Sequence, residues 1–258
     1  MKPDISEFSY GFALTNELIL PPGFPIVAAP VFPSLYQEGK AGGGWDVRLD
    51  RPGVPLFLQF KLSDCLQQRH SKEAATLGCP YYRMHLRPSR HSDQHALLLG
   101  LENSGEEVYY VAPSFHTVAE LNEAYRTRTV GARSRWFPPS CIGALPDDKD
   151  HYVSFKHPGP MIFRSTPRLL GDGATFSDFG RHVERAISLR GTESLAAPSL
   201  SRLATFLEGL TGQGRRTTAA SVGQAREWLR DRPPLEQIAY YASVFLEAQL
   251  FIASRAAV

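Results

Sequence analysis

Three polar residues, Asp46, Gln59 and Lys61, stand in or next to a strongly apolar part of the chain. Gln59 and Lys61 interrupt the apolar run Leu56–Leu62, and residues two apart point to the same face of a strand. Trp45–Leu49 alternates apolar and polar residues, as a half-buried strand does. The intervening Asp-Arg-Pro-Gly sequence favours a turn, because Pro fixes φ and Gly supplies positive φ. The pattern therefore predicts a β-hairpin on which Asp46 faces Gln59 and Lys61.

An acid, an amide and an ammonium at one end of a hairpin suit metal-assisted attack on a phosphodiester. Asp46 offers hard carboxylate oxygens to Mg²⁺ or Mn²⁺, and the carbonyl oxygen of Gln59 can complete the ligand shell. Lys61 can orient or help to deprotonate a metal-bound water, or stabilise charge on the phosphate. The alternative is an ordinary exposed hairpin face. Polar groups within a run of large apolar residues are costly unless they are used or paired, which favours a site.

An Asp followed by Gln-x-Lys on a buried strand resembles the PD-(D/E)XK nuclease superfamily, in the Gln-x-Lys variant of Mrr-type restriction and related defence nucleases. The resemblance covers residues 5–115. It implies an α/β fold with a restriction-endonuclease-like mixed sheet core flanked by helices. It also implies Mg²⁺-dependent cleavage of DNA in a prokaryotic restriction or antiphage system, often with an activating partner protein. The residues themselves leave RNA open as a substrate.

The family takes one more metal ligand from a Glu on its first helix. Ser9–Leu20 is expected to form a short buried helix that stops at Pro-Pro-Gly, and Glu17 in its last turns takes the place of this Glu. Glu38, a few residues before Asp46, is a second candidate that could replace or accompany Glu17. The sequence does not choose between them.

The elements that follow Lys61 fit the order of such a core. A polar, irregular stretch is expected at residues 64–80. Thr117 with Glu120 three residues later has the spacing of a capping box. The further predicted elements are a strand at Tyr81–Leu86, a helix from Ser92 to Asn103, a strand at Glu107–Ala112, a helix at Thr117–Tyr125, and short strands at Tyr152–Phe155 and Met161–Phe163.

Basic residues gather in two stretches of the chain, where few acids accompany them. Such clusters neutralise phosphates, and arginines interleaved with aromatic residues suit a surface that follows a nucleic-acid backbone. A solvated loop surface is the competing interpretation. The candidate nucleic-acid-binding residues are Arg69, Lys72, Arg83, Arg87 and Arg90 in the first stretch, and Arg126, Arg128, Arg133 and Arg135 in the second.

Composition sets outer bounds on the function. The chain has 258 residues, 43% hydrophobic content and a net charge of +2, which is typical of a globular protein and gives no global sign of nucleic-acid binding. Three widely spaced cysteines favour a reducing compartment. The sequence contains no signal-peptide pattern and no apolar run long enough for a membrane span, so a cytoplasmic protein is expected. Nucleotide-binding glycine loops and a Gly-x-Ser-x-Gly elbow are also missing from the sequence.

The predicted domains are a nuclease core at residues 1–170 and a helical region at residues 175–258. A last helix that opens at Pro233-Pro234 carries more large apolar side chains than one stripe requires. Leu235–Ile252 is therefore predicted to form a subunit contact, either in a homo-oligomer or with a partner protein. The helices could instead pack on the core. The competing function is a catalytically inactive nuclease-fold scaffold or adaptor, because Gln59 removes one charge from the metal site.

Overall fold

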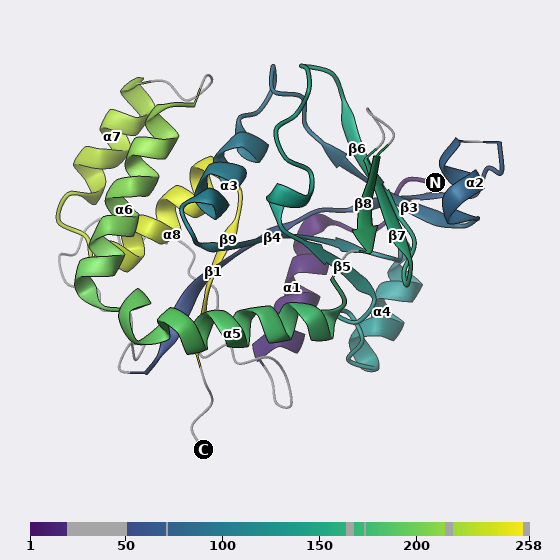
Figure 1. Cartoon of the computed structure of the whole chain (residues 1–258), viewed down its shortest axis with the longest axis horizontal. Coiled ribbons are helices and arrows are strands. Elements are labelled where there is room, and N and C mark those ends of the chain that lie inside the picture. Colours follow the sequence, from purple (N-terminus) through teal and green to yellow (C-terminus); the bar gives the residue numbers. More distant parts are fainter. Residues whose placement is uncertain (20–50, 71, 164–167, 173, 215–218, 255–258) are drawn as a thin grey trace. The chain divides into compact units, whose positions relative to one another are not determined.

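The computed structural model of the chain describes residues 1–19, 51–70, 72–163, 168–172, 174–214 and 219–254. These residues form a mixed α/β fold with two β-sheets, helices and a helical C-terminal region (Figure 1). The α/β class predicted from the sequence is thereby confirmed. Two compact units are each assembled from separate stretches of the chain. The first contains Met1–Phe24, Gln59–His91 and Tyr109–His182, and the second contains Pro25–Leu58, Ser92–Val108 and Val183–Val258.

A five-stranded antiparallel sheet organises the first unit. Its strands are, in spatial order, β2 (Ser63–Leu66), β3 (Tyr81–Leu86), β6 (His151–Phe155), β7 (Pro160–Phe163) and β8 (Arg168–Asp172). The same unit contains α1 (Glu7–Ile19), α2 (Lys72–Leu77), α4 (Val118–Arg126) and a short 3-10 helix, η2 (Pro139–Cys141).

Buried aromatic rings fill the core of the first unit. Tyr10 of α1 is fully buried, and its hydroxyl donates to Ser134 Oγ over 2.7 Å. The rings of Phe60 and Phe115 each lie 6.0 Å from that of Tyr10, edge to face. These contacts hold α1 against Phe60 and Phe115, because aromatic pairs of this geometry add to the energy of burial.

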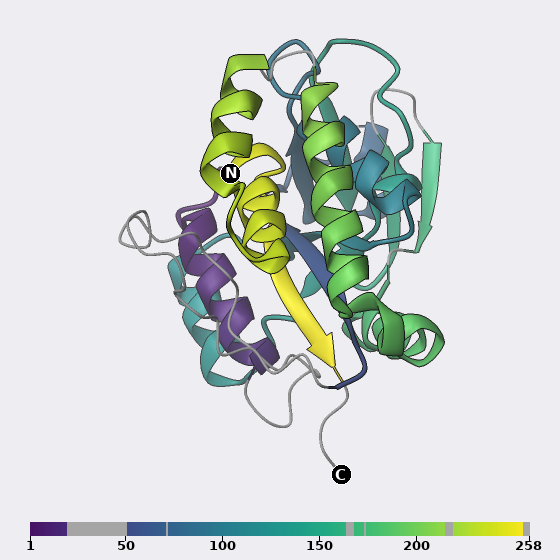
Figure 2. The ribbon, with the colours of Figure 1, turned by 90° about the vertical axis from the view of Figure 1, so that its left-hand side faces the viewer.

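In the second unit, a strand from the end of the chain pairs with a strand near its beginning. β9 (Gln249–Ser254) runs antiparallel to β1 (Gly53–Phe60), with Gly53 opposite Ser254 and Leu58 opposite Gln249. Helix α6 (Ala197–Gly212) packs against α3 (Gln94–Asn103), α7 (Ala219–Leu229) and α8 (Pro234–Phe245). Figure 2 shows α8 leading directly into β9.

The second sheet has the strand order β5-β4-β1-β9, so β1 lies between two other strands. β4 (Glu107–Pro113) pairs antiparallel with β5 (Ser134–Phe137), with Ala112 opposite Arg135. Helix α5 (Phe176–Ser194) follows β8 in sequence. The described neighbours of β1 are therefore β4 and β9, and the predicted hairpin strand Trp45–Leu49 lies outside the described residues.

Two local predictions were wrong. Residues 64–80 were expected to be irregular, but they contribute to β2 and contain α2. The last helix was expected to continue to Ile252, but α8 ends at Phe245, and the positive φ of 51° at Glu247 is incompatible with a continuing helix. Most of the apolar side chains named for the predicted subunit contact are buried at 1% exposure or less, and Phe245 at the end of α8 is partly exposed. The buried residues are Leu246, Leu250, Phe251 and Ile252.

The division into compact units also differs from the predicted domain boundary. A single break between residues 170 and 175 was expected, whereas the chain passes between the two units several times before its last crossing at His182–Val183. The difference arises because β9 pairs with β1, which joins an early stretch of sequence to the C-terminal helices.

Candidate active site

Gln59 and Lys61 lie at the end of a strand that is buried along its whole length. All eight residues of β1 are buried, and Gln59 is 1% exposed. Lys61, just beyond the strand, is 7% exposed, and its backbone N–H donates to the carbonyl of Val111 over 2.9 Å. The Gln59 Nε2 donates to the carbonyl of Phe60 over 2.8 Å. The sequence thus places an amide and an ammonium in a buried setting beside β4.

Phe60, which separates the two polar residues, faces α1. A Cβ built on Gly11 of α1 would stand 2.8 Å from the Phe60 ring, so helix and ring are in close contact. Successive side chains of a strand point to opposite faces. Gln59 is therefore directed away from the face on which α1 packs. Lys61 lies one residue beyond the end of β1, and its place on the same face as Gln59 stays a prediction.

Glu17, a predicted metal ligand, is committed to the backbone of a loop. One carboxylate oxygen accepts from the N–H of Val130 over 2.7 Å, and the other accepts from the N–H of Gly131 over 3.1 Å. The indole N–H of Trp136 donates to the Gly131 carbonyl over 3.0 Å, which holds the same loop. Glu17 is 8% exposed, and a buried carboxylate needs such charge-assisted bonds. Both carboxylate oxygens of Glu17 are thus engaged by the backbone of the loop at Val130 and Gly131.

The other predicted ligands, Asp46 and Glu38, lie outside the described residues. Within the described ranges, no group of three or more His, Cys, Asp or Glu side chains is placed to hold a metal ion. Asp46 and Glu38 therefore stay predicted ligands.

The second predicted basic group is only partly available to a nucleic acid. Arg135 is 1% exposed, and its guanidinium donates to the carbonyls of Lys156 and Gly159. Its prediction as a surface cation was wrong, because β5 carries it into the interior of the first unit. Arg133 is half-buried, with its guanidinium 5.2 Å from the centre of the Phe115 ring. The two remaining members, Arg126 and Arg128, are exposed.

Three members of the first predicted basic group, Arg83, Arg87 and Arg90, lie on β3 or in the residues that follow it. Arg83 forms an ion pair with Asp64 over 3.5 Å, and its guanidinium lies 4.6 Å from the centre of the Tyr152 ring. Arg90, which is 50% exposed, donates to the backbone carbonyl of Asp148 over 2.9 Å. Arg69 and Arg87 are exposed, and Lys72 opens α2.

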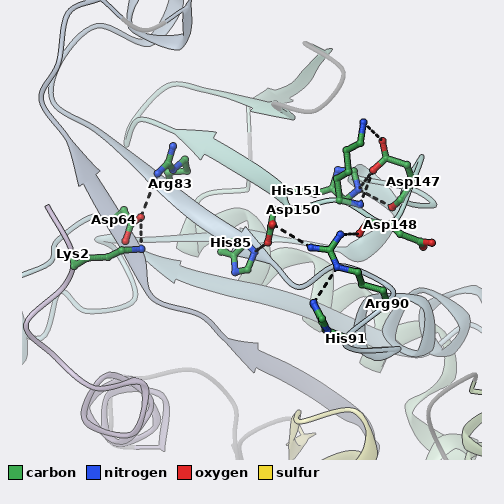
Figure 3. Close-up of polar contacts among 11 residues, drawn as sticks. Lys2, Asp64, Arg83, His85, Arg90, His91, Asp147, Asp148, Asp150 and His151 are labelled. Atoms are coloured by element: carbon green, nitrogen blue, oxygen red, sulfur yellow. Dashed lines mark hydrogen bonds and ion pairs between the residues drawn. The ribbon is translucent and has the colours of Figure 1, made fainter.

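Acidic residues that the sequence reasoning did not use lie against this basic group (Figure 3). Asp148 accepts from the hydroxyl of Ser89. Asp150 lies 2.8 Å from the Nε2 of His85 and 3.9 Å from the guanidinium of Arg90. The signal in the sequence is the run Asp-Asp-Lys-Asp at residues 147–150, which follows the two basic groups and is the most acidic short run near them.

A histidine and a glutamate at the start of α4 form a second polar group of the first unit. The Nδ1 of His116 lies 3.1 Å from the carboxylate of Glu120, and His116 is 8% exposed. Burial alone would raise the pKa of Glu120, but hydrogen bonds from the backbone N–H of His116 and from Thr117 lower it below its ordinary value. The same bonds complete the predicted capping box, so Glu120 has a structural role.

Comparisons with family models, curated proteins and solved structures found no match. In the part of the chain that the structure describes, every helix is too short or too polar to cross a membrane.

Proposed function

We propose that this chain is a metal-dependent endonuclease that hydrolyses DNA phosphodiester bonds, in keeping with its resemblance to the PD-(D/E)XK nucleases of prokaryotic defence systems. The observation that carries the proposal is the burial of Gln59 and Lys61, at 1% and 7% exposure, at the end of β1. Burial of an amide and an ammonium costs free energy that apolar residues would not cost. Such a cost is expected where the groups serve chemistry.

Lys61 and Gln59 would carry different parts of the reaction. The Lys61 ammonium, in a setting largely protected from water, would stabilise negative charge that develops on the phosphate and would orient the attacking water. Gln59 would hold that water or a ligand through its amide. Mg²⁺ or Mn²⁺ bound by Asp46 and Glu38 would supply Lewis-acid polarisation of the phosphate.

A specific observation favours the second candidate, an inactive nuclease-fold scaffold or adaptor. Both oxygens of Glu17 accept backbone hydrogen bonds, so the first-helix carboxylate of the family pattern is engaged elsewhere. If Glu38 does not replace it, the metal site has a single carboxylate, Asp46, and one neutral amide. Such a site binds divalent cations weakly, because carboxylate charge sets their affinity.

The test is cleavage of plasmid DNA and of a single-stranded RNA by the purified chain in the presence of Mg²⁺ or Mn²⁺. Lys61→Met is the decisive variant, because it keeps most of the apolar stem of the buried side chain and removes the charge. Lys61→Ala would also remove buried methylene groups and is expected to be less stable than Lys61→Met. Asp46→Asn removes the negative charge of the proposed ligand.

The proposal expects cleavage by the wild type and a loss of at least about a hundredfold in Lys61→Met and Asp46→Asn, the size typical for a lost electrostatic contact. Thermal unfolding of Lys61→Met close to that of the wild type shows that the loss concerns chemistry. Equal cleavage by the wild type and Lys61→Met would exclude the proposed role. No cleavage by any form, with or without a partner protein, would favour the scaffold.

A further inference from the structure

The acidic stretch Asp147–Asp150, here called the acidic loop, is seated on cationic side chains of the first unit (Figure 3). Arg90 is held at two points, by the carbonyl of Asp148 at 2.9 Å and by the carboxylate of Asp150 at 3.9 Å. Asp150 also lies 2.8 Å from His85, and the carboxylate of Asp148 accepts from Ser89. The acidic loop therefore contacts β3 and the turn after it at several positions.

One end of the acidic loop is anchored in the interior. His151 is fully buried, and its Nε2 lies 3.0 Å from the carbonyl and 3.3 Å from the carboxylate of Asp147. The carboxylate of Asp147 also accepts from the backbone N–H of Lys149 over 2.8 Å. Asp147 thus shapes the acidic loop, whereas the carboxylate of Asp150 and the backbone carbonyl of Asp148 reach across to basic side chains.

The contacts that reach across are open to solvent. The side chains of His85, Arg90 and Asp150 are 45%, 50% and 49% exposed, respectively. Ion pairs with this exposure contribute little to stability, because water screens them and holding two long side chains costs entropy. Arg83 and Asp64 are less exposed, at 20% and 16%, and Arg83 also lies over the Tyr152 ring. The pair of Arg83 with Asp64 is consequently structural, while the contacts of Arg90 can be exchanged for others.

A phosphate group offers a guanidinium the same kind of acceptor oxygens as a carboxylate. A nucleic acid adds an advantage that the acidic loop lacks, since each phosphate that is neutralised releases a bound counterion. Arg90 belongs to the basic group that the sequence predicts to bind nucleic acid, together with Arg87 on the same turn. The acidic loop therefore occupies the position that phosphates would take on this surface.

We propose that the acidic loop is an autoinhibitory contact: the carboxylate of Asp150 and the backbone carbonyl of Asp148 compete with the phosphates of DNA for Arg90 and its neighbours. The inference rests on the proposed function, because it assumes that this chain binds DNA. Binding would displace the Asp150 carboxylate from Arg90 and His85 and the Asp148 carbonyl from Arg90, while the contacts of Asp147 with His151 keep the base of the acidic loop in place.

The experiment measures binding of a fluorescein-labelled DNA duplex to the full chain by anisotropy over a series of salt concentrations. Asp148→Asn/Asp150→Asn, here called the opened form, removes the ion pairs of Asp150 with Arg90 and His85 and the negative charge beside Ser89, and leaves the hydrogen bond from Arg90 to the Asp148 carbonyl in place. Glu227→Gln/Asp231→Asn is the matched control, because it changes the net charge equally at two exposed positions in the second unit. A triple variant adds Arg90→Gln to the opened form.

The opened form is expected to bind DNA about tenfold more tightly than the wild type at moderate salt. The slope of log Kd against log salt concentration is expected to be steeper by about one for each cation that the variant frees. The matched control should change neither quantity to this extent, and Arg90→Gln should reverse the gain. An equal gain in the matched control, no gain in the opened form, or a gain that survives Arg90→Gln would overturn the inference.

Plasmid cleavage by the wild type and Lys61→Met is measured on the same samples and separates the two proposals. If cleavage depends on Lys61 but the opened form binds DNA no more tightly than the wild type, the nuclease proposal stands and the autoinhibitory contact is rejected. If the opened form binds DNA more tightly, Arg90→Gln reverses this increase in affinity, and no form cleaves DNA, the autoinhibitory contact is supported and the nuclease proposal is rejected.

Discussion

Glu17 and Val130 are 113 positions apart in the sequence, yet a 2.7 Å hydrogen bond joins the carboxylate of the first to the backbone N–H of the second. With the bond to Gly131, this contact ties the end of α1 to the loop before β5. A residue type that suggests a metal ligand in the sequence thus serves as an anchor in the fold.

Glu17→Gln should lower stability without affecting chemistry. Glutamine keeps one carbonyl acceptor, so either Val130 or Gly131 loses its partner in a buried setting, at a cost of about 1–3 kcal/mol in the free energy of unfolding. Urea unfolding followed by fluorescence measures the loss, and Glu38→Gln is the comparison. A variant that unfolds like the wild type but has lost DNA cleavage would instead restore Glu17 to the active site.

Gly53→Ala should destabilise the pairing of β1 with β9. A Cβ at this position would lie 2.6 Å from the Ala253 carbonyl oxygen and 2.8 Å from a methyl carbon of Leu195. The backbone oxygen cannot move freely, so a cost of about 1–3 kcal/mol in unfolding free energy is expected. Gly223→Ala in α7 is the control. It has open space around the new Cβ and should gain up to about 1 kcal/mol. Similar thermal midpoints for the two variants would contradict the described packing.

The protein should lose stability in alkaline solution. Burial, with Glu120 and Cys65 nearby, raises the pKa of Tyr82 from 10.0 to about 12, and burial, with Glu208 nearby, raises that of Tyr241 to about 12. A raised pKa means that the folded state holds the phenolic proton more tightly than the unfolded state does. The stabilisation is therefore complete below pH 10 and is lost as pH rises through about 12.

Urea unfolding at several pH values, together with tyrosinate absorbance, checks this. The slope of unfolding free energy against pH should become negative above the ordinary tyrosine pKa, and Tyr82→Phe should make it less steep. A folded protein in which all tyrosines titrate at their ordinary pKa would rule out the assigned burial.

Local signals were readable from the sequence because a few neighbouring residues determine them. The capping box of Thr117 and Glu120 is present as predicted, with the Thr117 hydroxyl accepting from the Glu120 N–H and the Glu120 carboxylate accepting from the Thr117 N–H. The burial of Gln59 and Lys61 agrees with their position in an apolar run. In each case the deciding contacts span few residues or follow from the strand itself.

Other features depend on partners that are distant in the chain. Gln249–Ser254 is a short apolar run, which fits a buried helix and a buried strand equally well, and its pairing with β1 decides the outcome. The hydrogen-bond partners of Glu17 depend in the same way on where the loop at Val130 lies. The contact between Asp150 and His85 joins two regions that are 65 positions apart in the sequence, so neither region by itself indicates the contact.

The pairing of β1 with β9 also sets an order on folding during synthesis. β1 has left the ribosome long before β9, and everything from residue 59 to residue 248 must be translated in between. Contacts between such distant segments form slowly, because closing a long loop costs entropy before any contact is gained. Until β9 arrives, the backbone edge of β1 on that side has no native partner, and such an edge is a template for pairing with other chains.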